Sequence, residues 1–438
     1  MVCVSLQKGL YARHELGKPI VVGLSGAGQM GFDIIVQTYM MKGIRVGAVC
    51  SSSFERTRQA AVVAGYDASD VIKANTPTRI DAAIEAGRIA VTDDFTAMSK
   101  AGLVEVIIDA TGNPEFGVQL AFSAIQNGKH IVLLNIESEV TVGRAIRKWA
   151  ESSGVVYTGA AGDEPAATMC LIRCAETLGM EIIAAGKGKN NPLNISAVPD
   201  EYLLEARRRN MSPRMLVEFI DGTKTQVEMT ALANAAGLTV DVPGMHGSFA
   251  TLDNLSKQLC PKADGGILCK RGVVEYTMGN GVAPGVFVVV RPRHARVSER
   301  MVSLKVGEGP YFTLSRPFHL TSLEVPLSAA RAVLHGSADI QTLNRPYVEC
   351  CAIAKRNLEI GEKLGCIGMG EYRGLAVTYR YAREKYLMPI GLCEGAVIRK
   401  RVQSGEFITH SNTVADENLM ITRVRKELDA EYYDEIPI

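Results

Sequence analysis

The sequence lacks several features that would point to particular classes of protein. Its 48 basic and 47 acidic side chains nearly cancel, and the basic runs at 207–209 and 399–401 are short. A nucleic-acid-binding protein usually shows a domain-wide positive bias, so we expect no nucleic-acid partner. No uncharged apolar run reaches the roughly 18 residues of a membrane span, so we also expect no membrane partner.

Motifs of common catalytic and metal-binding classes are absent as well. The ten cysteines include no CxxC pair, and neither HExxH nor GxSxG occurs. Scattered cysteines without regular spacing are typical of a reducing compartment. Charged side chains at positions 8, 13, 14, 15 and 18 interrupt any apolar segment near the start. We therefore expect no signal peptide and a cytoplasmic protein.

What the sequence does contain is an alternation of short apolar runs with helical patterns, from about residue 19 to 160. This alternation predicts an α/β fold with a doubly wound parallel sheet. We expect three domains: a Rossmann domain over 1–160, an α+β catalytic domain over 161–345, and a small β-rich domain over 346–438. The last expectation comes from the short strands and many glycines of the C-terminal segment.

A glycine-rich loop follows the first apolar run. Gly26, Gly28 and Gly31, with Gln29 and Met30 between the last two, fit GxGxxG between a strand and a helix. Such glycines permit a tight turn, the approach of a pyrophosphate and close packing of the helix. The phosphates would lie at the helix N-terminus, where free N–H groups favour negative charge. The loop predicts a dinucleotide site.

The end of the second predicted strand indicates which dinucleotide. An NAD site normally has Asp or Glu there, whereas this chain has Ser51, Ser52 and Ser53 followed by Arg56 and Arg58. Hydroxyl and guanidinium groups suit a 2′-phosphate, which favours NADP(H) as the cofactor. The alternative is that the serines cap a helix and the arginines are solvated.

Two later strands end in polar residues at the edge where doubly wound sheets bind ligands. Thr111, Gly112 and Asn113 follow one strand, and we expect the nicotinamide to lie along them. Asn135 and Glu137 follow the next. Glu137 could face the substrate or a metal, or it could simply stabilise the first turn of the next helix.

The segment GKGKNNPLN, residues 186–194, places Lys187 and Lys189 among glycines and asparagines. Glycine allows close backbone approach, and two ammonium groups beside it predict a pocket for a phosphate or carboxylate. An exposed hairpin turn with similar residues is the alternative. We favour the pocket, because the asparagines add amide donors that a plain turn does not need.

A second polar segment begins at Asp221 and continues into a helix. Lys224 is a candidate proton donor to a carbonyl oxygen that receives hydride, and Asp221 could orient it. Asn234 lies on an otherwise apolar helical face and needs a partner, so we count it among the catalytic candidates. Thr225 and Glu228 have the spacing of a capping box, so we interpret Glu228 as structural. His246 and His319 are likewise interpreted as structural hydrogen bonders.

Together the motifs resemble a known family. GxGxxG, DATGNPEFG, GKHIVLLNIESEV, GVVYTGAAGDEPAATM, GKGKNNPLN and DGTKTQVEMTALANAAGL are similar to segments of homoserine dehydrogenase-like oxidoreductases, and more closely of their 1-deoxy-D-xylulose 5-phosphate reductoisomerase-like branch. AKRNLEIGEKLGCIG resembles a SAF domain. Homoserine dehydrogenases carry Asn-Lys where this chain has Asn135-Ile136-Glu137, a departure that argues against homoserine as the substrate.

The resemblance implies an NADPH-dependent oxidoreductase of a small phosphorylated or carboxylated polyol, and a homodimer. The leading specific reaction that the resemblance implies is the formation of 2-C-methyl-D-erythritol 4-phosphate with Mg²⁺ or Mn²⁺. The candidate ligands of the metal ion are Glu137, Asp163 and Glu164. One alternative is a simple NAD(P)-dependent dehydrogenase of a sugar acid or homoserine-like substrate. Another is a regulatory protein that binds a dinucleotide without turnover.

Overall fold

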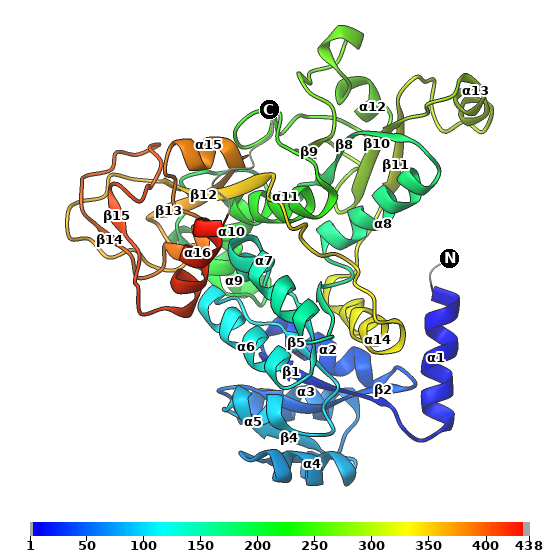
Figure 1. Ribbon diagram of the computed structural model, residues 1–438, viewed down its shortest axis with the longest axis vertical. Helices are drawn as coiled ribbons and strands as arrows, with labels where there is room; N and C mark the ends of the chain where they lie inside the picture. Colours follow the sequence, from blue (N-terminus) through cyan, green and yellow to red (C-terminus); the bar gives the residue numbers. More distant parts are fainter. Residues whose placement is uncertain (1–2, 432–438) are drawn as a thin grey trace. The chain divides into compact units, whose positions relative to one another are not determined.

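The computed structural model describes residues 3–431, so the ends of the first and third expected domains, residues 1–2 and 432–438, lie outside the described residues. The chain divides into two units (Figure 1). The first comprises residues 1–163 and 320–341, and the second comprises 164–319 and 342–438. The three-domain division with boundaries at 160 and 345 stays a prediction.

A parallel sheet of seven strands forms the centre of the first unit, which confirms the predicted doubly wound α/β fold. All six apolar runs between residues 19 and 160 are strands, and a short strand at 71–73 is added to them. The spatial order is β3 (Val71–Lys73), β4 (Ile89–Thr92), β2 (Ile44–Cys50), β1 (Ile20–Ser25), β5 (Val106–Asp109), β6 (His130–Leu133) and β7 (Tyr157–Gly159).

Several helices of this unit begin where the sequence supplies capping residues. Ser53 accepts a hydrogen bond from the backbone N–H of Arg56, and Asn113 accepts one from Phe116 with proline next in the chain. Such caps satisfy backbone donors that have no partner inside the helix. The helices are α1 (Cys3–Glu15), α2 (Gln29–Tyr39), α3 (Phe54–Ala64), η1 (Ala68–Asp70), α4 (Pro77–Glu85), α5 (Phe95–Lys100), α6 (Pro114–Gln126), α7 (Ile136–Ser152), η4 (Thr321–Leu323) and α14 (Val325–His335).

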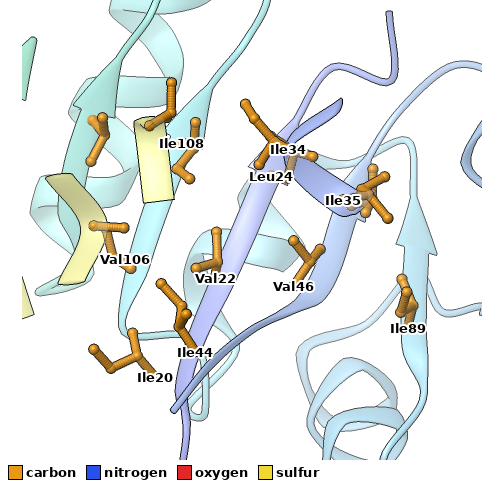
Figure 2. Close-up of a cluster of buried hydrophobic side chains, with 14 of the residues drawn as sticks. Ile20, Val22, Leu24, Ile34, Ile35, Ile44, Val46, Ile89, Val106 and Ile108 are labelled. Atoms are coloured by element: carbon orange, nitrogen blue, oxygen red, sulfur yellow. The ribbon is translucent and has the colours of Figure 1, made fainter. Parts of the chain in front are cut away.

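The core of the first unit lies along the central strands. Figure 2 shows Val22 and Leu24 of β1 between Val46 of β2 and Val106 of β5. Burying a side chain of this size contributes about 1.5–3 kcal/mol. Helix α14, although late in the sequence, packs on the same cluster through Val325 and Ala329. The core therefore holds the carboxyl ends of the strands, and the loops that follow them, in fixed positions.

The second unit contains a four-stranded mixed sheet in the order β11 (Phe312–Arg316), β10 (Val286–Arg291), β8 (Glu181–Gly188) and β9 (Val273–Thr277). Helices α8 and α11 pack against it. Its helices up to residue 303 are α8 (Glu164–Thr177), η2 (Pro199–Tyr202), α9 (Leu203–Arg208), α10 (Pro213–Ile220), α11 (Thr223–Ala236), α12 (Leu255–Gln258), η3 (Lys262–Asp264) and α13 (Ala295–Ser303).

The C-terminal part of the second unit, residues 346–431, is built from short strands, and we call it the C-terminal module. Its strands β12 and β13 form an antiparallel pair that packs on α11. Among the described residues, every helix is too short or too polar to cross a lipid bilayer. The elements of the module are β12 (Val348–Ala354), β13 (Tyr372–Thr378), α15 (Tyr379–Glu384), η5 (Ile390–Leu392), β14 (Val397–Ile398), β15 (Thr413–Val414) and α16 (Met420–Glu431).

Candidate functional site

The glycine-rich loop has the geometry that its sequence predicts. Gly26 has φ +97°, and a Cβ atom there would lie 2.8 Å from the carbonyl oxygen of Ala110. A Cβ on Gly31 would lie only 1.9 Å from the carbonyl oxygen of Gly26, so α2 can approach β1 only because this residue is glycine. A Cβ on Gly28 would meet nothing within 4 Å. Gly28 thus leaves open space at the N-terminus of α2, where Gln29 and Met30 form the first turn.

A pocket of about 330 Å³ lies next to this loop, within the first unit. It is formed at the carboxyl ends of four strands, β1, β2, β4 and β5, which is the edge predicted for a ligand. The pocket can accept part of a dinucleotide on backbone N–H groups and hydroxyls. Its lining residues are Ser25, Gly26, Ala27, Gly28, Cys50, Ser51, Ser52, Ser53, Arg56, Asp93, Thr111 and Phe116.

The pocket contains the positive charge that a 2′-phosphate needs. Arg56 is exposed, and within residues 3–431 its guanidinium has no ion-pair partner. Arg58, by contrast, is bonded to Glu55 at 2.7 Å. Ser53 caps α3, as the alternative interpretation expected, while Ser51 and Ser52 line the pocket. Asp93, which follows β4, adds a carboxylate that the sequence did not reveal, because β4 lies beside β2 only in the folded sheet.

A network of hydrogen bonds fixes the loops after β5 and β6. Asp109 is fully buried and accepts bonds from the backbone N–H and the hydroxyl of Thr111, at 2.9 and 2.6 Å. Asn135 donates to Thr111 and to the carbonyl oxygen of Asn113. Burial raises the pKa of Asp109 to about 6, although the bonds from Thr111 and Asn135 oppose the rise. The network holds Thr111 at the pocket.

The other residues predicted to contact the cofactor at this edge have different surroundings. Gly112 is exposed. Asn113 caps α6, and the fully buried Asn135 caps α7, so both side-chain amides hold the backbone. Glu137 is buried in the first turn of α7, the position that the helix-dipole interpretation expected. A role for Glu137 toward substrate or metal stays a prediction.

In the second unit, Lys187 lies between two carboxylates rather than in an exposed turn. Its ammonium group donates to Glu164 at the start of α8 and to Glu228 in α11. All three residues are buried. Burial alone lowers the pKa of Lys187, but the two carboxylates outweigh it and hold the pKa above the usual value. His319 Nε2 lies 3.4 Å from Oε1 of Glu164. Because its charge is neutralised, Lys187 is poorly suited to grip an anion.

Lys189, two residues after Lys187, has different hydrogen-bond partners. Its Nζ atom donates to the carbonyl oxygen of Phe219 at 2.5 Å, and no carboxylate among the described residues pairs with it. Burial and then the charge of Lys187 lower the pKa of Lys189 to about 8. An amine that titrates near neutrality can both give and take a proton during catalysis.

The predicted pairing of Asp221 with Lys224 is replaced by a different one. Asp221 Oδ2 lies 3.0 Å from the Nζ atom of Lys355 in the C-terminal module, and both side chains are almost completely buried. Burial raises the pKa of Asp221, which Lys355 opposes. Lys224 is half-buried in the first turn of α11. Burial and then the charge of Glu164 raise the pKa of Glu228, and the charges of Lys187 and Lys224 oppose the rise. Asp221 therefore orients Lys355.

The interpretation of Glu228 needs correction. Helix α11 begins at Thr223 after Gly222, so Thr225 is inside it and the proposed capping box does not form; Glu228 bonds Lys187 instead. The amide of Asn234 donates to the carbonyl oxygen of Val348, and its oxygen accepts from the backbone of residues 347 and 348. These bonds join α11 to β12, and a catalytic role for Asn234 stays a prediction.

Glu164 and Glu228 fit the chemistry of a divalent cation. Two buried carboxylates converge on one positive charge, at present the Lys187 ammonium, and repulsion from Glu164 contributes to the raised pKa of Glu228. Mg²⁺ and Mn²⁺ prefer such hard oxygen ligands. Asp163, the residue before Glu164, offers a further buried carboxylate.

The second histidine, His246, has the structural role that was expected. Its Nδ1 atom lies 2.9 Å from Oε1 of the fully buried Glu275, and its backbone N–H donates to the same carboxylate. The hydrogen bond to Glu275 raises the pKa of His246, while burial opposes the rise.

Comparison with known proteins finds one family model that matches part of the second unit. The family model described as the catalytic domain of oxidoreductase DRL matches residues 162–325. Comparison with curated protein sequences gives no match.

Among solved structures, the chain is similar to 1-deoxy-D-xylulose 5-phosphate reductoisomerase from Zymomonas mobilis in complex with NADPH, with 13% identity, a TM-score of 0.40 and coverage of 74% of each chain. It is also similar to myo-inositol 2-dehydrogenase from Lactobacillus plantarum, with 12% identity, a TM-score of 0.39 and coverage of 73% of this chain and 91% of that one. Likenesses this weak carry no argument about function. The GxGxxG pocket of the parallel sheet, together with the similarity of residues 162–325 to the DRL catalytic domain, indicates that the chain is an NAD(P)-dependent oxidoreductase.

Proposed function

We propose that this protein is an NADPH-dependent reductase of a small phosphorylated or carboxylated polyol, with formation of 2-C-methyl-D-erythritol 4-phosphate from 1-deoxyxylulose 5-phosphate as the leading specific reaction. The observation that carries the proposal is Lys189, a buried amine with a pKa of about 8 next to the Glu164, Lys187 and Glu228 group in the domain that matches the DRL model.

In this proposal the first unit holds the cofactor. The pyrophosphate lies over Gly28 at the N-terminus of α2, and Arg56 with Ser51 and Ser52 binds the 2′-phosphate. The unpaired guanidinium of Arg56 supports NADP(H) over NAD(H), since a 2′-phosphate gives it a charged partner. Thr111 borders the path of the dinucleotide along the strand ends.

The second unit holds the substrate. Lys189 donates a proton to the carbonyl oxygen as hydride arrives at the carbonyl carbon, and takes it back in the reverse direction. Glu164 and Glu228 hold Lys187 charged, and burial together with the charge of Lys187 lowers the pKa of Lys189 so that it can donate. A Mg²⁺ or Mn²⁺ ion would be held by Glu164 and Glu228, and would polarise the substrate carbonyl when bound.

A second candidate is a simple NAD(P)-dependent dehydrogenase of a sugar acid, which needs no rearrangement and no metal. One observation favours it: the Lys187 ammonium already balances Glu164 and Glu228, so these carboxylates do not require a cation. The two candidates differ in metal dependence and in product. The homodimer, the SAF identity of the C-terminal module and a place in isoprenoid biosynthesis belong to the proposal on the strength of resemblance alone.

The test is NADPH oxidation by the purified protein with 1-deoxyxylulose 5-phosphate and Mg²⁺ or Mn²⁺, with NADH as a control and Lys187→Ala for comparison. Metal-dependent formation of methylerythritol 4-phosphate is the expected result. Turnover of sugar acids without metal would support the second candidate, and the absence of turnover with either class would contradict both.

A further inference from the structure

Arg373 in β13 is a half-buried cation without an acidic partner. Its guanidinium makes one long hydrogen bond, 3.4 Å to the carbonyl oxygen of Gly374, and no carboxylate among residues 3–431 forms an ion pair with it. Removing a charge from water costs free energy unless a partner replaces the lost hydration. An anion that reached this guanidinium would supply such a partner.

The backbone around Arg373 is fixed to α11. The N–H of Gly374 donates to the hydroxyl of Thr223 at 3.0 Å, and the N–H of Ala376 donates to the side chain of Gln226 at 2.9 Å. The Lys355 to Asp221 ion pair is a third link between the C-terminal module and the start of this helix. The module thus holds Arg373 in one place relative to the helix that carries Glu228.

Arg373 shares its surroundings with the proposed proton donor. Asp221 acts electrostatically on both Arg373 and Lys189, and Tyr276 also acts on Arg373. Tyr276 lies opposite Lys187 in the paired strands β8 and β9. Residues paired across two strands point to the same face of the sheet, so Tyr276 and Lys187 share a face. Residues two apart along a strand also share a face, which places Lys189 on the same face as Lys187. Lys189 and Arg373, two cations without an ion-paired carboxylate among residues 3–431, therefore both lie within electrostatic range of Asp221.

We propose that Arg373 binds the anionic group of the substrate, a phosphate or a carboxylate, so that the C-terminal module supplies part of the substrate site. A guanidinium donates two parallel hydrogen bonds to either anion, which sets orientation as well as affinity. The inference rests on the proposed function in one respect, that the anion bound here belongs to the molecule that is reduced. Lys187 cannot serve in this way, because Glu164 and Glu228 already neutralise it.

The test uses the wild-type chain and needs no turnover. The protein is treated with phenylglyoxal, which modifies accessible arginines, and the modified residues are mapped by peptide mass spectrometry. The treatment is repeated with inorganic phosphate and, separately, with acetate. Arg399, exposed in the same module, is the control within the molecule. Protection by phosphate alone indicates a phosphorylated substrate, and protection by acetate alone indicates a carboxylated one.

We expect one or both anions to slow the modification of Arg373 severalfold and to leave Arg399 unchanged. Equal rates at Arg373 with and without both anions would overturn the proposal, as would an Arg373 that does not react at all, because a ligand could not reach it. A protected Arg373 in a protein that oxidises no NADPH would leave this inference standing and contradict the proposed function alone. In an active protein, Arg373→Lys should raise KM for the anionic substrate with a much smaller effect on kcat.

Discussion

Asp221 and Lys355 lie 134 positions apart in the chain, yet their side chains form a buried ion pair with a 3.0 Å separation of Oδ2 and Nζ. Lys355 also donates to the carbonyl oxygen of Met369. Because the pair joins the C-terminal module to the start of α11, its loss should lower the stability of the second unit.

Lys355→Met should destabilise the protein by about 3–5 kcal/mol, because it leaves the Asp221 carboxylate buried without its cation. Urea unfolding followed by circular dichroism measures the effect. Lys400→Met, at an exposed position of the same module, is the control and should change little. The double variant Asp221→Leu/Lys355→Met should lose less than the sum of the single variants; a strictly additive loss would contradict the pairing.

Gly28→Ala separates folding from cofactor binding. The added methyl group meets no protein atom, and the φ of −71° at Gly28 suits alanine, so the variant should melt like the wild type. The methyl would stand where the pyrophosphate approaches, so NADPH binding should weaken at least tenfold, about 1.4 kcal/mol. Fluorescence titration with NADPH measures this.

The comparison for this variant is Gly31→Ala, in which the new Cβ collides with the carbonyl oxygen of Gly26 and should lower stability itself. Normal NADPH affinity in Gly28→Ala would show that the dinucleotide does not pass over this residue.

Arg56→Gln tests the choice of cofactor. Loss of a charged hydrogen-bond donor to a 2′-phosphate costs about 1.5–3 kcal/mol, so the dissociation constant of NADPH should rise by about ten- to a hundredfold. NADH affinity should stay the same, because NADH has no phosphate there. Arg58→Gln is the matched control, since Arg58 is bonded to Glu55. Equal losses for NADPH and NADH would contradict the assignment of Arg56.

The pH dependence of turnover reports on Lys189. Reduction needs the protonated amine, so kcat for reduction should be high below pH 8 and fall as the pH rises through about 8. Oxidation of the product needs the neutral amine, so kcat in that direction should rise over the same interval. Steady-state rates measured across pH in both directions give the two curves. Profiles with no inflection near pH 8 in either direction would exclude Lys189 as the proton carrier.

The first unit could be predicted from the sequence because its signals are local. The six glycine-rich loop positions are consecutive, the apolar runs are contiguous, and each strand end is read directly from the chain. Arg56 lies six residues after the end of β2, so its place in the pocket followed from the same reasoning. Asp93 was missed, since the neighbourhood of β4 and β2 depends on strand order rather than on sequence distance.

The second unit could be predicted only in part, because its contacts join distant residues. Lys187 was identified from the sequence as a site residue. Its partners Glu164 and Glu228 could not be, because they are 23 and 41 positions away in the chain. The sequence left Glu228 with a local interpretation, which the start of α11 at Thr223 overturned. Lys355 and Arg373 could not be predicted from the sequence, because their positions depend on the packing of β12 and β13 on α11.

The most direct test of Lys189 as the proton donor compares wild type and Lys189→Met for NADPH binding and NADPH oxidation with the same anionic carbonyl substrate, beginning with 1-deoxyxylulose 5-phosphate and Mg²⁺. Both proteins should bind NADPH equally, and only the wild type should oxidise it at an appreciable rate. Oxidation by Lys189→Met at the wild-type rate would show that Lys189 does not carry the proton.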